Sequence, residues 1–347
     1  METLKTSEEV FEVAFAYMKS KALFAGLHLG VFDALANGPG SFRALREATG
    51  AEERGLVTLL TALVSLGLIE RVDRGKGEEL FANAPASQAM LVGSPDGDFG
   101  DYCRNQIDRQ MYPFLHNLSD VLRGQHDTVP FRDYETWFRD ASEATLYSES
   151  QHSVSLPAAN LLCALVDLSD ARRLLDVGGG SGAFSITLCQ HYSELSATII
   201  DFPSVADVGR RFVAKAGLED RVDFVCGSAL AVDWPGAHDA ILFSYVSGSV
   251  AAEGVYEFYR RAYRALVPGG RVLVHDFMVD DDRRGPLLPA LWALQHAAFT
   301  PGGVSLTPSF VKGALTEAGF ANIEILPFVP AMTRLVLARK PLDEGSE

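Results

Sequence analysis

The stretch LLDVGGGSGAF, residues 174–184, decides the fold of this 347-residue chain. An apolar run passes through Asp176 into four glycines within five positions, and a helix-forming segment starts near Ala183. This order predicts a strand, a tight turn that brings the backbone close to a ligand, and a helix whose N-terminus faces that ligand. The next strand ends at Asp201, whose carboxylate can accept hydrogen bonds from both hydroxyls of a ribose. We therefore expect an adenosine-type cofactor at this turn.

The spacing Gly178-x-Gly180-x-x-Ala183 by itself also matches the fingerprint of dinucleotide-binding folds. The carboxylate of Asp176 lies just ahead of the glycines, where it favours a cationic amino-acid group and disfavours a pyrophosphate. The residues thus favour a cofactor with a cationic amino-acid end, although the glycines alone do not decide this.

Around this stretch, strand-like and helix-length segments alternate from residue 171 onward. Five β-rich runs separated by helical segments predict βαβ units and a parallel sheet. The runs at 321–329 and 333–340 are separated by only a short break, which predicts an antiparallel hairpin. The expected fold class is α/β, a Rossmann-like doubly wound and mostly parallel seven-stranded sheet with an antiparallel C-terminal hairpin.

The first part of the chain predicts a separate helical domain. Apolar residues recur at helical spacing from Val10 to Ala36 but on more than one face, so a second copy of the chain is expected to cover them. Two further helices and a hairpin within 68–85 complete a winged-helix plan. We expect a winged-helix homodimerisation domain over 1–98, connecting helices that line the substrate pocket over 99–170, and a catalytic domain over 171–347.

Composition argues against several classes of partner. Lys and Arg total 30 and Asp and Glu total 45, so the net charge is −15, which repels nucleic acids and anionic membranes. No apolar run is long enough to span a bilayer. The four cysteines are far apart and show no metal-ligand spacing, which is typical of a reducing compartment. The expectation is a cytoplasmic protein with no metal, no nucleic-acid partner and no membrane partner.

Several motifs together resemble class I methyltransferases that use S-adenosylmethionine (SAM): DVGGGSG, DFPSV at 201–205, Cys226-Gly227-Ser228 and ALVPGGRVLVHDF at 265–277. The chain is similar over nearly its whole length to the small-molecule O-methyltransferases that include plant caffeate and animal acetylserotonin enzymes. The resemblance implies that SAM is the cofactor. It also implies, by position, that Asp176, Gly178 and Gly180 line the methionine end, that Asp201 holds the ribose, that Phe202, Ser228 and Ala229 surround the adenine, and that Ser244 and Tyr245 face the cofactor and acceptor.

The same resemblance reveals a departure at the catalytic position. Members of the family usually carry a His-Asp pair where this chain has Gly248-Ser249, and glutamates where it has Asp276 and Ser305. General-base help in removing a hydroxyl proton is worth roughly 10²–10⁴ in rate. A thioether sulfur has no proton to lose, so the sequence favours methylation at sulfur or carbon. One candidate acceptor is the thioether 4-methylthio-2-hydroxybutyrate of dimethylsulfoniopropionate synthesis.

The remaining candidate residues concern the acceptor and a substitute base. Tyr147, Gln151 and His152 lie in the helix that usually faces the methyl group, and Tyr147, Tyr245, His152 and Asp276 are the catalytic candidates. Candidates for binding the acceptor are Arg104, Arg109, Tyr112, Gln151 and His296. Three alternatives stay open: an O-methyltransferase with His152 or Asp276 as base, a SAM-binding enzyme for another reaction, and a SAM-responsive winged-helix regulator.

Overall fold

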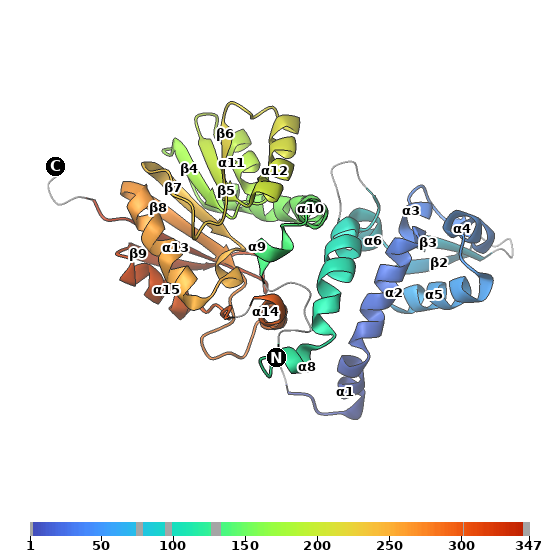
Figure 1. The fold of residues 1–347 in the computed structure, drawn as a ribbon. Helices are drawn as coiled ribbons and strands as arrows, with labels where there is room; N and C mark the ends of the chain where they lie inside the picture. The colour runs from blue at the N-terminus through green and yellow to red at the C-terminus, as the bar shows by residue number, and fades with distance from the viewer. Residues whose placement is uncertain (1–2, 74–78, 94–98, 126–132, 301, 343–347) are drawn as a thin grey trace. The chain divides into compact units, whose positions relative to one another are not determined.

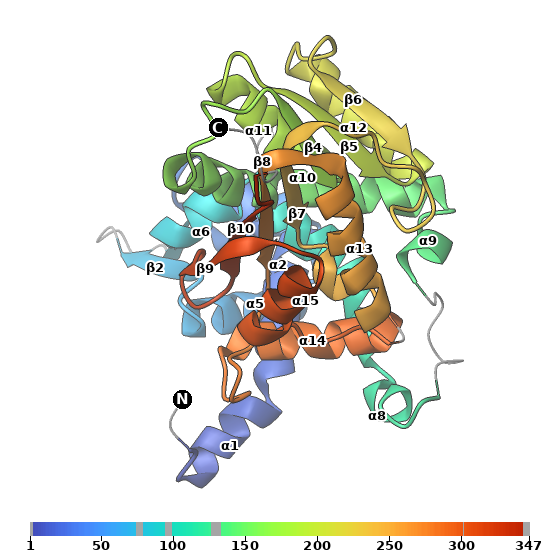
Figure 2. The same cartoon turned by 90° about the vertical axis from the view of Figure 1, so that its left-hand side faces the viewer.

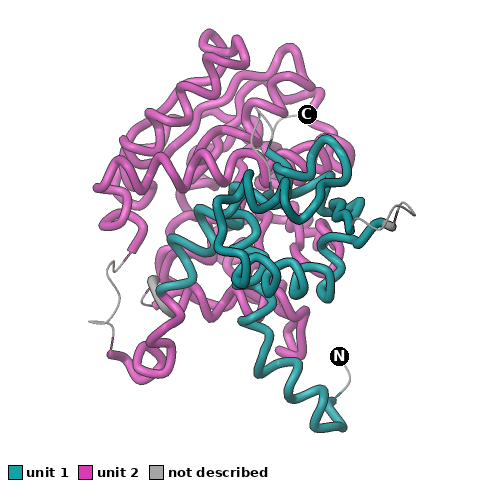
Figure 3. The backbone as a smooth tube through the Cα atoms, turned by 90° about the vertical axis from the view of Figure 1, so that its right-hand side faces the viewer, with its two compact units in different colours: residues 1–113 teal, residues 114–347 magenta. Residues whose placement is uncertain are grey.

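The computed structural model describes residues 3–73, 79–93, 99–125, 133–300 and 302–342. The chain folds into two compact units that divide between Pro113 and Phe114, drawn in teal and magenta in Figure 3. The segment expected to connect two domains, 99–170, is therefore shared: its first residues belong to the first unit and the rest to the second.

The first unit consists of short helices followed by a small sheet (Figure 1). Its helices are α1 Ser7–Ala14, α2 Ala16–His28, α3 Val31–Ala34, α4 Phe42–Thr49, α5 Glu53–Ser65, α6 Pro85–Met90, α7 Phe99–Asp101 and the π-helix η1 Tyr102–Met111. Its strands are β1 Gly40–Ser41, β2 Ile69–Asp73 and β3 Glu79–Asn83, in the order β1-β3-β2. Helices followed by the β2–β3 hairpin agree with the winged-helix plan.

The apolar N-terminal run forms three helices rather than one, because Gly30 adopts a left-handed conformation between α2 and α3 and Phe15 interrupts α1 and α2. Helix α2 buries Phe24 and Leu27 in the core of the first unit. Helix α1 is different: it begins with a Thr6–Glu9 capping box and buries none of its residues. Its apolar side chains are thus left for another surface to cover.

The second unit contains a seven-stranded sheet with helices on both faces (Figures 1 and 2). The strands are β4 Arg173–Val177, β5 Ser196–Asp201, β6 Val222–Cys226, β7 His238–Ser244, β8 Leu266–Asp276, β9 Ala321–Pro327 and β10 Arg334–Arg339. The helices are η2 Tyr112–Leu115 (which starts in the first unit), α8 Leu118–Val121, α9 Tyr134–Trp137, α10 Ala141–Leu165, α11 Ala183–His191, α12 Pro203–Lys215, η4 Ser247–Ser249, α13 Ala252–Ala265, α14 Leu287–Phe299 and α15 Pro308–Glu317.

The strand order is β6-β5-β4-β7-β8-β10-β9, and β10 runs antiparallel to both of its neighbours. This confirms the predicted mostly parallel sheet and its antiparallel C-terminal hairpin. Side chains alternate between the two faces of each strand, so Leu174 packs with α10, α11 and α12 whereas Leu175 packs with α13 and α15. Strand β5 pairs with one side of β4, and β7, which follows later in the chain, pairs with the other side. The strand order therefore reverses at β4, and the crevice at such a reversal, outside the carboxyl end of the strand, is where ligands bind in open α/β sheets.

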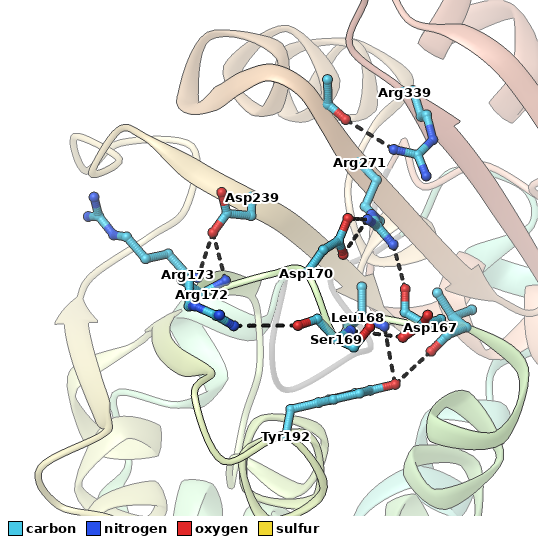
Figure 4. A network of polar contacts seen from close by, with 12 residues as sticks. Asp167, Leu168, Ser169, Asp170, Arg172, Arg173, Tyr192, Asp239, Arg271 and Arg339 are labelled. Atoms are coloured by element: carbon cyan, nitrogen blue, oxygen red, sulfur yellow. Dashed lines mark hydrogen bonds and ion pairs between the residues drawn. The ribbon is translucent and has the colours of Figure 1, made fainter.

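A polar network fixes the start of β4, at the edge of the sheet away from that crevice (Figure 4). The Asp239 carboxylate accepts hydrogen bonds from the backbone N–H groups of Arg172 and Arg173 at 2.8 and 2.9 Å. One guanidinium nitrogen of Arg271, Nη2, donates to both carboxylate oxygens of Asp170. The network ties the loop after α10 to β7 and β8, and it leaves the carboxyl ends of the strands open for a ligand.

Candidate functional site

The glycine turn after β4 brings backbone and side chains into close contact. Gly178 has a φ of +68°, and a Cβ atom added there would lie 2.7 Å from Cγ2 of Val246. A Cβ atom on Gly179 would lie 2.6 Å from Cγ of Asp176. Both positions therefore require glycine, and α11 begins at Ala183 as predicted.

Asp176 is buried beneath this turn and retains one oxygen for a ligand. Its Oδ2 accepts a hydrogen bond from the hydroxyl of Ser185 at 2.7 Å, whereas Oδ1 is buried without a hydrogen-bond partner. Burial raises the pKa of Asp176 to about 7. A buried acceptor without a partner is costly, so this oxygen is suited to a donor or a cation brought in by a ligand.

Asp201 lies at the end of β5, where the neighbouring turn holds it. Its Oδ2 accepts from the backbone N–H of Gly180 at 2.8 Å, and its Oδ1 accepts from that of Phe202 at 2.7 Å. Burial raises the pKa of Asp201 to about 6. Each carboxylate oxygen has a further lone pair, so the fixed carboxylate can still accept two hydroxyl donors.

A cavity of about 480 Å³ opens over these residues, within the size range of small-molecule sites. All eight residues predicted to bind the cofactor line it: Asp176, Gly178, Gly180, Asp201, Phe202, Ser228, Ala229 and Ser244. Three residues predicted to act on the acceptor line it as well: Tyr147, Gln151 and Tyr245. These placements agree with the expected arrangement, and the role of each residue remains a prediction.

The cavity wall is aromatic and acidic. Its rings are those of Tyr134, Phe138, Tyr147, Phe184, Phe202, Tyr245 and Phe258. Its carboxyl groups are those of Asp133, Glu135, Asp176 and Asp201. Among the described residues that line it there is no lysine, arginine, histidine or cysteine. The described part of this wall therefore offers an anionic acceptor no positive charge.

Three further polar atoms in the wall are buried and make no hydrogen bond: the hydroxyl oxygens of Ser148 and Thr300 and the amide oxygen of Gln151. Sequence reasoning selected Gln151 but missed Ser148 and Thr300. Ser148 lies three residues before Gln151 on α10, so helical spacing could have found it. Nothing in the sequence around Thr300, just after α14, indicates that it reaches the cavity.

His152 does not line the cavity. Its Nδ1 lies 2.8 Å from the hydroxyl of Ser181, and its ring stacks on Phe212 with the centroids 3.7 Å apart. Ser181 is part of the glycine turn and does line the cavity. The imidazole therefore contacts the glycine turn through the Ser181 hydroxyl and does not itself line the cavity.

Tyr245 follows β7 in a left-handed conformation, with a φ of +58°, which is unusual for a residue with a side chain. Its ring faces His275, with the centroids 4.3 Å apart. Burial raises the pKa of Tyr245 well above its ordinary value, so the phenol stays protonated and can donate a hydrogen bond, but it does not act as a base. His275 in turn bridges Ser244 and Thr333, at 2.9 and 3.0 Å, and burial lowers its pKa to about 3.

Arg104, Arg109 and Tyr112 belong to the first unit, within or just after η1. Arg104 pairs with Asp101 and donates to the carbonyl of Leu27. Tyr112 packs on the core of that unit, and the Lys21 ammonium lies 5.1 Å from its ring centroid. Arg104 and Tyr112 thus make structural contacts within their own unit, and their predicted binding of the acceptor stays untested.

Asp276 and His296 meet in a second, much smaller cavity of about 10 Å³, which Gly248 and Ser305 also line. Asp276 accepts from the backbone N–H groups of Gly248 at 3.1 Å and Phe277 at 2.8 Å. Burial raises the pKa of Asp276 to about 7 and lowers that of His296 to about 4. The three positions at which the resemblance led us to expect catalytic groups, 248, 276 and 305, therefore line one small cavity together with His296.

Comparison with known proteins identifies the family. An O-methyltransferase domain matches residues 116–321, and an O-methyltransferase dimerisation domain matches residues 11–93. The chain belongs to the O-methyltransferase family. It is 30% identical to the 3-hydroxy-5-methyl-1-naphthoate 3-O-methyltransferase of Streptomyces sahachiroi, covering 91% of this chain and 90% of that one. It is 29% identical to the acetylserotonin O-methyltransferase of Homo sapiens, over 95% and 96% of the two chains.

The solved structure of human N-acetylserotonin methyltransferase in complex with SAM superposes with a TM-score of 0.86 at 26% identity. The match covers 98% of this chain and all of that chain. The protein is thus a SAM-dependent methyltransferase, which confirms the predicted enzyme class and cofactor. The residues at the glycine turn suit SAM. The Asp176 oxygen without a partner can accept a hydrogen bond from its ammonium group, and the Asp201 carboxylate can accept from its ribose hydroxyls. The glycines, where a Cβ atom would clash, allow the cofactor to approach the backbone closely.

None of the described helices combines the length and the apolar character needed to cross a bilayer. No group of three or more His, Cys, Asp or Glu side chains placed to hold a metal ion occurs among the described residues.

Proposed function

We propose that this enzyme methylates a hydroxyl oxygen of an uncharged small molecule that contains an aromatic ring. The observation that carries the acceptor class is the wall of the large cavity, which is rich in aromatic rings and, among the described residues, carries no cation. Named relatives such as the naphthoate and acetylserotonin enzymes are O-methyltransferases, which supports oxygen as the reacting atom.

The chain's own residues would perform three tasks. Asp176 and Asp201 hold the two ends of SAM, which supplies an activated methyl group when bound. The rings of Tyr147 and Phe138, whose centroids lie 5.0 Å apart, would pack against the flat face of the acceptor. The unpartnered oxygens of Ser148, Gln151 and Thr300 would orient its polar groups.

Methylation at sulfur or carbon, the reaction favoured by the sequence, is the second candidate. It is supported by the absence of any imidazole among the described residues that line the large cavity. A thioether that carries a carboxylate fits this wall poorly, because four carboxyl groups face the cavity. An uncharged thioether or an electron-rich ring carbon would fit better.

The reacting atom can be read directly with SAM that carries carbon-13 in its methyl group. We would offer three uncharged acceptors of similar size: 2-naphthol, methyl 2-naphthyl sulfide and 2-methylindole. The carbon-13 chemical shift of the product separates O-, S- and C-methyl groups. We expect O-methylation of 2-naphthol and weaker turnover of 3-hydroxy-2-naphthoate, which adds a carboxylate. Transfer only to sulfur or carbon, or to no phenol at all, would contradict the proposal.

The dimerisation domain and the exposed face of α1 support a homodimer. Phe11 is 57% exposed and Val13 is 66% exposed, although both are strongly apolar. Apolar side chains left open on a helix that buries nothing mark an interaction surface. We infer that a second copy of the chain covers this face.

A further inference from the structure

Two polar side chains on one face of α10 present hydrogen-bonding atoms to the large cavity. Ser148 and Gln151 both line it, and because they are three residues apart on a helix, their Cβ atoms lie roughly 5–6 Å from each other. The hydroxyl oxygen of Ser148 and the amide oxygen of Gln151 are both buried, and neither has a hydrogen-bond partner among the described residues. Buried polar atoms are rarely left unpaired, so the two atoms indicate a ligand that supplies their partners.

The hydroxyl of Ser148 differs from many other hydroxyls inside the helices of this chain. A helical serine or threonine can donate to the backbone carbonyl four residues earlier, and such bonds are made by Thr58, Thr61, Ser65, Ser155, Thr187 and Thr316. Ser148 is only 2% exposed, yet it makes no such bond to its own helix. Its hydroxyl is therefore available to a group in the cavity.

Two other hydroxyls of the same wall show why the pair on α10 is informative. Ser155, one turn after Gln151, lines the cavity too, but its hydroxyl donates to the carbonyl of Gln151 at 2.9 Å. Thr300 has a buried hydroxyl without a partner in the described part of the chain. A single hydroxyl can pair with almost any polar group, so Thr300 defines a ligand less narrowly than the pair does.

The chemistry of the pair specifies the group that it can bind. An amide oxygen only accepts hydrogen bonds, so Gln151 requires a donor, whereas the hydroxyl of Ser148 can donate as well as accept. A hydroxyl group of the ligand meets both needs, because it donates its proton to Gln151 and accepts from Ser148 through a lone pair. A carboxylate or a methoxy group has no proton to donate, and its oxygen would face the amide oxygen unpaired.

The pair lies beside the turn that receives the cofactor. His152 directly follows Gln151, and its Nδ1 lies 2.8 Å from the hydroxyl of Ser181 in the glycine turn. The ammonium group of SAM already has an acceptor there, the Asp176 oxygen without a partner. Ser148 and Gln151 are therefore placed to hold the acceptor next to the cofactor.

We propose that the acceptor carries two hydroxyl groups on its aromatic framework, and that Ser148 and Gln151 hold one of them while the other is methylated. The inference rests on the proposed O-methylation and names its substrate class as an uncharged dihydroxyarene. The oxygen of the reacting hydroxyl forms a bond to the methyl carbon as the bond from that carbon to the sulfonium of SAM breaks. S-adenosylhomocysteine and the proton of the reacting hydroxyl are released. The held hydroxyl keeps its proton in the hydrogen bond to Gln151.

This recognition limits the enzyme to one methylation of each acceptor. In the product, a methoxy group has replaced one of the two hydroxyls. A second methylation requires the product to bind the other way round, with its methoxy oxygen against the amide oxygen of Gln151. Two acceptors then meet and the amide oxygen stays unpaired, which is costly in a buried site. We therefore expect the monomethyl ether to accumulate.

The first experiment compares acceptors that differ in one group. We would offer 2-naphthol, the 2,3-, 2,6- and 2,7-dihydroxynaphthalenes, which place the second hydroxyl at different distances from the first, and the monomethyl ether of each diol. We expect kcat/KM of the best diol to exceed that of 2-naphthol, and that of its own monomethyl ether, by about 10-fold or more, because each comparator leaves the pair without a donor. Equal values for the diol and either comparator overturn the inference.

The second experiment assigns this preference to the pair. Gln151→Met keeps the size of the side chain and removes its acceptor, and Ser148→Ala removes only the hydroxyl. Each should lower kcat/KM for the best diol about 10-fold and that for 2-naphthol less than about twofold. The matched control is Ser155→Ala, whose hydroxyl is already used by the backbone, and it should keep the preference for the diol. Equal losses on both acceptors would show a general effect on packing and would refute the assignment.

Calorimetry separates the acceptor from the cofactor without turnover. The best diol is titrated into enzyme saturated with S-adenosylhomocysteine, and both variants of the pair should bind it about 10-fold more weakly than wild type. Their affinity for S-adenosylhomocysteine itself should stay within about twofold of wild type. A matching loss of that affinity would assign the pair to the cofactor and refute the inference. If the wild type methylates no phenol, the proposed function has failed; if it methylates 2-naphthol as well as the diols, only this inference has failed.

Discussion

We expect the affinity for SAM to fall at mildly acidic pH, because Asp176 and Asp201, the two carboxyl groups proposed to hold it, take up protons there in the free enzyme. Burial raises the pKa of Asp176 to about 7 and that of Asp201 to about 6. SAM carries a sulfonium and an ammonium group, and its ribose hydroxyls need acceptors. It therefore binds the enzyme with both carboxyl groups ionised, so each must first lose its proton.

The size of the effect follows from proton linkage. With those pKa values, SAM binding releases about 1.4 protons at pH 6 and about 0.1 at pH 8. The same linkage makes the dissociation constant about 20-fold larger at pH 6 than at pH 8. The direction of the pH dependence follows from the raised pKa values. In the free enzyme these carboxyl groups become negative only as the pH rises through their pKa values, so the affinity for a cationic ligand increases with pH.

Isothermal titration calorimetry at the two pH values, in buffers of different ionisation enthalpy, measures both the affinity and the protons released. Asp176→Asn is the matched control, because it removes only one titrating group. Its dissociation constant should change about twofold over the same range, the share of Asp201. Equal affinities at pH 6 and pH 8, or no proton release at pH 6, would refute the assignment of these carboxylates to the cofactor.

Four further predictions can be checked with purified protein. Gly178→Ala should lower the free energy of unfolding by about 1–3 kcal/mol in denaturant titration, because φ is +68° and the new methyl group meets Val246. The control Gly236→Ala places its methyl group in open space and should leave the free energy of unfolding nearly unchanged. Gly313→Ala, exposed within α15, should raise the free energy of unfolding by about 0.5–1 kcal/mol; a loss would contradict the helix. If Asp276 acts as the base, kcat should rise with pH near 7 as this carboxyl group ionises, and Asp276→Asn should remove that rise; an unchanged pH profile would exclude Asp276 as the base. The double variant Phe11→Asp/Val13→Asp should lower the molar mass measured by light scattering toward the 37.6 kDa of one chain. An unaltered dimer mass would exclude the α1 face as the dimer interface.

Much of the fold could be predicted because its signals are local. The strand, glycine turn and helix at 174–184 fix one βαβ unit, and the alternation of strands and helices repeats the unit along the chain. The short break before Thr333 predicts the hairpin, because two adjacent strands with little chain between them can only pair antiparallel. The residues predicted to bind the cofactor follow from the same local patterns, since they lie at or just after the carboxyl ends of parallel strands, and in the structure they line one cavity.

The acceptor side could not be predicted to the same degree, because it depends on contacts between distant segments. Arg104 is a candidate for binding the acceptor, and in the structure it pairs with Asp101, three residues earlier. The helical spacing of this pair is visible in the sequence, and the binding of an acceptor by Arg104 stays a prediction. His152 was expected to face the acceptor, and its ring instead stacks on Phe212 of α12. Which face of α10 meets α12 is decided by packing, and one sequence does not show that packing.

The glycine at position 248 illustrates this limit most clearly. By sequence it is a missing histidine, and a missing base predicts an acceptor that loses no proton. In the folded chain the same glycine leaves room for an imidazole 48 positions later, held by α14 beside Asp276. What surrounds position 248 is thus set by α14, a distant segment of the chain, and the residue type at 248 does not by itself decide between oxygen and sulfur.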